Sequence, residues 1–270
     1  MCFGSDAETC PYENLYKIIG VFNDNNEYRI KLIKADYSTI DDLGTNGDYS
    51  GKITDFVAEK DILYYYKGQE DVNNIAIYDW NRVNYYLATQ NARSANLWDY
   101  SELNKTNLND YFVQNLGYDS SKWIDTTSWQ VGIVVTGFME YTTKEIFDKE
   151  FSSNETIQHD AKVGLMYVSD YKYALSSSYW NMTETEIREQ YETFYHNINN
   201  NNWLDLGLPE WLITRYSDGI AVFGTYYLGH LVPQGVWGAQ TAVRPCFYLK
   251  SNVAYESGDG SLENLYRLSV

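Results

Sequence analysis

The chain has 270 residues, of which 44% are hydrophobic and 17% aromatic, including 27 tyrosines and 8 tryptophans. This composition excludes an intrinsically disordered chain, because so much apolar surface can offset the entropy that is lost on folding. The formal net charge of −17, with no basic stripe, excludes nucleic acid as a partner and disfavours anionic membrane surfaces.

The first predicted element is a β-hairpin over residues 14–36. Its two apolar runs flank residues 23–26, an Asn/Asp segment that tolerates the left-handed backbone of a reversing loop. The apolar runs 62–66 and 75–78 are predicted to be short strands of a second hairpin. Residues 1–60 could form a separable β subdomain.

Three helices carry start or stop signals. The segment 107–116 places apolar side chains on one face and is followed by Gly117, a frequent residue after a helix end. Thr142 and Thr183 each stand three residues before a glutamate. That spacing is typical of a capping box, so each threonine predicts the start of a further helix.

Strands are predicted where a short apolar run is bounded by turn residues. The runs 129–135 and 163–168 are predicted to be buried strands, and short strands alternating with turns are predicted at 211–214, 220–227, 243–249 and 265–268. Strands and helices mix without a regular βαβ order, which predicts an α+β fold in a single domain over residues 1–270. The segments 163–168 and 243–249 are expected to lie side by side in one sheet.

Two of the three cysteines lie close together at the chain start. Cys2 and Cys10 bracket a short polar loop, a spacing that a disulfide can close, and such a bond implies an oxidising compartment. Cys246 lies within an apolar run and is predicted to be a buried small hydrophobe. Arg244, which precedes Pro245, is predicted to be structural, pairing with a carboxylate or with strand-end carbonyls.

Several phrases in order along the chain resemble a known family. They are residues 2–6 with Cys10, then 15–22, 32–37, 47–51, 162–171 and 242–249, and they include Leu-Met-Tyr-Val-Ser-Asp-Tyr and Val-Arg-Pro-Cys-Phe-Tyr-Leu. They are similar to a family of Firmicutes prepilin-like surface proteins of unassigned activity, and the resemblance covers nearly the full length. It implies an extracellular globular domain on a Gram-positive surface, with its export and anchor segment absent from this chain.

The segment 243–249 more distantly resembles the closing strand of C-type-lectin-like folds. That resemblance implies one domain with a mixed or antiparallel sheet, short helices and long loops. Cys246 departs from the surface-protein family, in which a small aliphatic residue is usual at this position. The departure favours a buried thiol over a functional one.

The sequence spells out no catalytic residue, metal ligand or cofactor motif. The three histidines are isolated, and neither a Cys-x-x-Cys pair nor a nucleophile elbow occurs. The acidic turns 41–48 and 256–260 carry the oxygen ligands that Ca²⁺ prefers, but such turns are usually just solvated, so calcium remains an alternative. Asp170 is the best single candidate for a catalytic carboxylate, with a structural turn as the other interpretation.

The segment 215–240 is the predicted ligand-binding region. It combines glycines, which give loops conformational reach, with aromatic side chains that offer contact area at low entropic cost. In lectin-like folds the loops ahead of the closing strand form the ligand face. The predicted ligand-binding residues are Tyr216, Phe223, Tyr226, Tyr227, His230, Trp237 and Gln240. The alternative is that these side chains pack a twisted hairpin.

The predicted function is recognition or adhesion at the cell surface, with a glycan or protein ligand on a host or neighbouring cell. No apolar run reaches the about 18 residues of a membrane helix, so membrane insertion by this segment is not predicted. Two alternatives remain. One is a structural pilus or surface subunit that associates with itself, and the other is a carbohydrate-active hydrolase with paired carboxylates.

Overall fold

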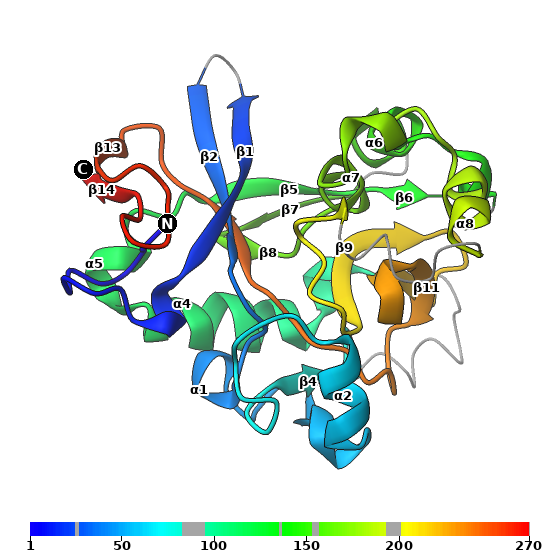
Figure 1. Cartoon of the computed structure of the whole chain (residues 1–270), viewed down its shortest axis with the longest axis horizontal. Helices are drawn as coiled ribbons and strands as arrows, with labels where there is room; N and C mark the ends of the chain where they lie inside the picture. The colour runs from blue at the N-terminus through cyan, green and yellow to red at the C-terminus, as the bar shows by residue number, and fades with distance from the viewer. Residues whose placement is uncertain (25–26, 83–94, 135–136, 153–156, 193–200, 270) are drawn as a thin grey trace.

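The computed structural model describes residues 1–24, 27–82, 95–134, 137–152, 157–192 and 201–269. Within these ranges the strands form two four-stranded sheets and three two-stranded ribbons, with short helices between them (Figure 1). The fold is therefore α+β, as predicted. None of the helices in the described ranges is long and apolar enough to cross a membrane.

The first sheet is antiparallel and has the order β1-β2-β12-β8. Its strands are β1 (Tyr16–Asp24), β2 (Glu27–Lys34), β12 (Cys246–Tyr248) and β8 (Val163–Gly164). Phe247 of β12 pairs with Leu32 on one side and with Val163 on the other. This register confirms that the phrases near residues 165 and 245 share a sheet. It also joins the N-terminal hairpin, which was considered as part of a separable unit, to the C-terminal strand.

The second sheet has the order β11-β10-β9-β6, with β6 parallel to β9 and the other pairs antiparallel. Its strands are β6 (Ile133–Val134), β9 (Glu210–Tyr216), β10 (Ala221–Thr225) and β11 (Leu231–Gly235). The ribbons pair β3 (Tyr49–Lys52) with β4 (Ala76–Tyr78), β5 (Thr127–Val131) with β7 (Ile157–Ala161), and β13 (Ala254–Ser257) with β14 (Arg267–Ser269).

The helices are short and lie between the strands. They are α1 (Ile40–Leu43), α2 (Glu59–Tyr65), the π-helix η4 (Leu103–Phe112), α4 (Val113–Asn115), α5 (Gly117–Ser121), α6 (Thr143–Ser152), α7 (Val168–Tyr173) and α8 (Glu184–Glu192). Single 3₁₀ turns are η1 (Tyr12–Asn14), η2 (Ile53–Asp55), η3 (Trp98–Tyr100), η5 (Phe138–Glu140), η6 (Ser177–Tyr179) and η7 (Tyr227–Gly229). Both predicted capping boxes are present, because Thr142 N donates to Glu145 and Thr183 N to Glu186, each at 2.8 Å.

One predicted strand is wrong and another is too long, because short apolar runs do not distinguish a strand from a helix. The run 62–66 belongs mostly to helix α2, which buries Ile62 and leaves Leu63 and Tyr64 exposed. The run 163–168 contains only the two residues of β8, since Val168 already begins α7. The helix predicted from residue 107 starts earlier, at Leu103, and winds first as a π-helix.

The predicted disulfide and the predicted structural role of Arg244 are both confirmed. Cys2 and Cys10 form a disulfide, while Cys246 is a buried free thiol. The buried Arg244 guanidinium pairs with both carboxylate oxygens of Glu210, at 2.8 and 2.6 Å, and so ties the closing strand to β9. Arg244 is therefore structural, as predicted.

Candidate ligand-binding site

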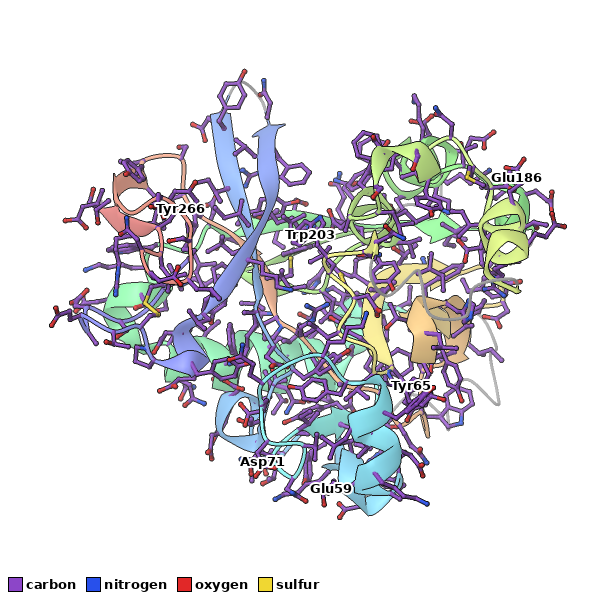
Figure 2. All side chains as sticks on the ribbon, in the orientation of Figure 1. Glu59, Tyr65, Asp71, Glu186, Trp203 and Tyr266 are labelled. Carbon is purple, nitrogen blue, oxygen red and sulfur yellow. A yellow bond between two sulfur atoms is a disulfide. The ribbon has the colours of Figure 1, made fainter. Side chains whose placement is uncertain are left out.

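A large aromatic-lined cavity lies between the β1–β2 hairpin and helices α6 and α7. It has a volume of about 780 Å³, and we call it the aromatic groove. In Figure 1 the hairpin and the two helices stand on either side of ribbon β5–β7. Figure 2 shows Trp203 between the hairpin and α7, and Lys17 of β1 donates a hydrogen bond to its carbonyl at 2.9 Å.

The rim of the groove exposes four large aromatic side chains. They are Phe147, Tyr173, Trp180 and Trp203, and each is 38–45% exposed. Tyr173 packs edge-on against Trp180 with the ring centroids 5.3 Å apart. Aromatic side chains bury large areas when they can, so four half-exposed rings around one opening leave contact area for a ligand.

The floor of the groove contains a buried ion pair inside a set of aromatic rings. The Lys31 ammonium lies 2.5 Å from Asp170 Oδ2. Four ring centroids surround that ammonium at 4.4–5.7 Å, those of Tyr167, Tyr248, Trp129 and Phe22. Burial opposes the charge, but the Asp170 carboxylate and the surrounding groups outweigh it and raise the pKa of Lys31 well above its ordinary value.

Close packing beneath this floor depends on a glycine. Gly164 of β8 lies directly under the Trp129 ring, and a Cβ added there would be 2.8 Å from it. Only glycine allows the indole to approach the strand this closely. Trp129 Nε1 donates to the carbonyl of Ala161 at 3.1 Å, which fixes the ring against Lys31.

Asp170 links the floor to helix α7. Its Oδ2 accepts from Lys31 and from the backbone N–H of Tyr167, at 2.8 Å, which caps the helix. Among the described residues no donor reaches its Oδ1, although the side chain is only 6% exposed and lines the groove. Asp170 therefore has a structural role, but as the capping residue of α7 and not in a strand-end turn, and it is also a polar group facing the cavity.

A second buried carboxylate, that of Glu150, also holds the start of α7. Glu150 accepts from the backbone N–H groups of Val168 and Ser169, at 3.0 and 3.2 Å, and from the Thr214 hydroxyl. Burial raises the pKa of Glu150 to about 7. Glu150 does not line the groove, so it positions the start of α7 rather than meeting a ligand.

Amide side chains form one wall of the groove. Gln130 of β5 and Gln158 of β7 are cross-strand partners, and both line the cavity. No hydrogen bond to either side-chain amide is found in the part of the chain that the structure describes. Each amide therefore presents donors and an acceptor to the cavity.

The seven ligand-binding residues predicted from the sequence do not come together in this groove. Phe223 is a correction, because its ring is fully buried against Phe138 and the half-buried Tyr216, with centroids 5.0 and 5.8 Å away. A ring in that position fills the core of the second sheet, as the hairpin-packing alternative requires. It has no surface that a ligand could touch.

The other predicted residues divide between two surfaces. Tyr226 packs edge to face on Tyr227, and Tyr227 packs in turn on Tyr65 of α2. Figure 2 shows Tyr65 apart from Trp203. The carbonyl of the half-buried His230 accepts from Tyr226 N at 2.8 Å. Trp237 and Gln240 line a separate cavity of about 480 Å³.

The rim residues of the groove were missed because they are scattered singly along the chain. Trp180 follows the serines at 176–178 and Tyr179, and Trp203 directly follows an asparagine tract. A tryptophan in such polar surroundings is a usable signal, since it has no long neighbouring apolar run that would bury it.

Three carboxylates of the two acidic turns are engaged within the protein, those of Asp42, Asp48 and Asp259, the last of which accepts from Ser261 N at 2.9 Å. Asp42 caps α1 and pairs with Lys34 at 3.0 Å. The buried Asp48 accepts from the N–H groups of Arg82 and Leu103, and burial raises its pKa to about 6. Within the described ranges no group of three or more His, Cys, Asp or Glu side chains is placed to hold a metal ion.

No family model, no curated protein and no solved structure matches this chain. The resemblance to prepilin-like surface proteins and to C-type-lectin-like folds therefore stays a prediction. The geometry of the groove is the main evidence for function.

Proposed function

We propose that this protein is an extracellular recognition domain of a bacterial surface that binds its ligand, a glycan or a protein, in the aromatic groove. The supporting observation is the convergence of four half-exposed rings on one cavity with the Asp170 carboxylate at its floor. Such sites are mostly apolar, with a few polar groups that fix orientation.

The proposed extracellular location rests on two further points. The Cys2–Cys10 disulfide suits an oxidising compartment outside the cytoplasm. The ordered phrases along the chain resemble Gram-positive prepilin-like surface proteins. A C-type-lectin-like arrangement of the α+β fold is part of the same proposal, and it rests on the closing segment 243–249.

Recognition fits the groove better than glycoside hydrolysis does. A hydrolase of the usual kind needs two carboxyl groups on either side of the scissile bond. Asp170 is the one carboxylate among the described residues that line the groove, and it is already paired with Lys31. Both oxygens of the neighbouring Glu150 carboxylate accept hydrogen bonds from the protein itself.

The proposal is tested by binding of the labelled protein to Gram-positive and host cells, measured by flow cytometry. We expect Trp180→Ala with Trp203→Ala to weaken binding by about tenfold or more, because aromatic anchors dominate such interfaces. Tyr226→Ala is the matched control, since it removes an exposed ring outside the groove.

Three outcomes would contradict the proposal. If only Tyr226→Ala weakens binding, the ligand surface is the one predicted at residues 215–240. If the wild-type protein binds no cell at all, recognition is wrong. If instead it forms oligomers in light scattering that the tryptophan variants abolish, the rings serve assembly, as in a pilus or surface subunit.

A further inference from the structure

The floor of the groove contains an unused hydrogen-bond acceptor. Asp170 directs Oδ2 to Lys31 and to the backbone of Tyr167, while Oδ1 receives no bond from the described residues. Because Asp170 lines the groove, Oδ1 can accept from a donor that enters the cavity, either water or a ligand hydroxyl. The missing donor is therefore expected from outside the chain.

The charges around the groove favour a donor without charge. A cation at Oδ1 would meet the Lys31 ammonium already bound to the same carboxylate. An anion would face Asp170 in a chain of net charge −17. Arg29, at the edge of the groove, is engaged with Asp125 at 2.9 Å and lies over the Tyr248 ring. A hydroxyl group satisfies Oδ1 without a charge conflict.

The rest of the lining suits a molecule that carries both apolar faces and hydroxyl groups. The rings of the rim offer flat apolar contact, while Gln130 and Gln158 offer amide donors and acceptors beside the carboxylate. A pyranose ring has C–H faces for the former and hydroxyl edges for the latter. The volume of about 780 Å³ lies in the range of small-molecule sites, which suits a short oligosaccharide.

A peptide that adds to the sheet fits the groove less well. β1 is the edge strand of its sheet and lines the groove, so strand addition is the obvious mode of peptide binding. However, the register of β1 shifts between Ile18 and Gly20, which marks a bulge. A bulge interrupts the row of backbone groups that an added strand would need.

We propose that the aromatic groove binds an uncharged saccharide, with a hydroxyl donating to Asp170 Oδ1, other hydroxyls meeting Gln130 and Gln158, and sugar faces packing on Trp180 and Trp203. This inference rests on the proposed recognition function and names its ligand class. Asp170 is thus a ligand-contacting residue, and Lys31 positions it.

The test is calorimetric titration of the intact protein with defined oligosaccharides. The probes are neutral tetrasaccharides of glucose, galactose, mannose and N-acetylglucosamine, the corresponding uronic acid oligomers, and a set of hydrophobic peptides. We expect at least one neutral probe to bind and its uronic acid counterpart to bind about tenfold more weakly or worse, because of charge repulsion at Asp170.

The variants separate contact from folding. Gln130→Ala with Gln158→Ala changes one half-buried and one exposed side chain and should weaken sugar binding by about tenfold, the effect of losing hydrogen bonds to a ligand. Asp170→Asn is made together with Lys31→Met, so that no buried charge is left unpaired, and a comparable loss is expected. Tyr226→Ala should bind like the wild-type protein.

The results that would overturn the inference differ from those that would overturn the proposed function. Equal or tighter binding of uronic acid oligomers contradicts the uncharged class. Binding of peptides alone, or of cells but none of the sugars, contradicts the saccharide and leaves recognition standing. Sugar binding that survives the glutamine and Asp170 variants also contradicts it. If neither cells nor sugars are bound, both proposals fail.

Discussion

The aromatic groove and the surface at residues 215–240 are both rich in aromatic side chains, yet they differ in what surrounds the rings. Tyr226 and Tyr227 pack on each other and on Tyr65, so part of their area is already used. In the groove, rings from several elements border a cavity. Aromatic density along the sequence is therefore a weaker guide to a site than convergence of rings on a cavity.

The polar groups of the two regions differ in the same way. In the cavity beside Trp237, Asp79 accepts from Gly238 N and from Arg82 Nε, so both carboxylate oxygens are engaged. In the groove, Asp170 has one oxygen without a donor among the described residues. A carboxylate with an unused oxygen is what a ligand can exploit.

The largest effect is expected at the floor of the groove. Lys31→Ala leaves Asp170 as an unpaired buried charge and empties the space between four rings, so the free energy of unfolding should fall by about 5 kcal/mol. Urea denaturation measures it. The control is Lys144→Ala, which breaks an exposed pair with Asp148 and should cost at most about 0.5 kcal/mol. Similar losses for both variants would mean that the floor is not a structural centre.

The next effect distinguishes the buried and exposed parts of segment 215–240. Phe223→Ala opens a cavity in the core of the second sheet and should lower stability by about 4 kcal/mol. Tyr226→Ala removes a half-exposed ring and should cost about 1 kcal/mol or less. Thermal or urea unfolding of the two variants gives the comparison, and equal costs would contradict the burial of Phe223.

A smaller effect depends on pH and involves Glu150. Its pKa is about 7 in the folded protein against an ordinary 4.5, so the folded state binds the proton more tightly. The stabilising contribution of Glu150 to the free energy of unfolding is therefore fully present below pH 4.5 and is lost as pH rises through 7. Between pH 4 and 8 this loss amounts to about 3 kcal/mol, and Glu150→Gln should remove it. Parallel stability–pH curves for variant and wild type would show that Glu150 is not perturbed.

The smallest effect concerns the disulfide. Its cysteines are separated by 8 residues, and closing so short a loop should stabilise the fold by about 2.5 kcal/mol. Because Cys2 lines a cavity near the chain start and not the groove, mild reduction should lower the melting temperature without changing ligand binding. Loss of binding under reduction, while the near-ultraviolet circular dichroism stays native, would link the two regions.

The features of the fold that could be predicted from the sequence are those that depend on local chemistry. The hairpin over 14–36, both capping boxes and the mixed α+β character depend on residues a few positions apart, so the sequence alone reveals them. The segment 62–66 is a helix and not the predicted strand, and the strand at 163–168 is shorter than predicted, because the burial of both segments is set by distant parts of the chain. Only Ile62 of α2 is fully buried, and Asp170 starts α7 by capping it.

The sequence by itself determined the class of fold, the Cys2–Cys10 bond and the structural role of Arg244. Only the tertiary structure decided where a ligand could bind. The groove takes its rings and polar groups from strands, helices and loops between Ile19 and Tyr248. No local sequence pattern indicates that these residues come together, because the burial or exposure of a side chain depends on which parts of the folded chain pack against it.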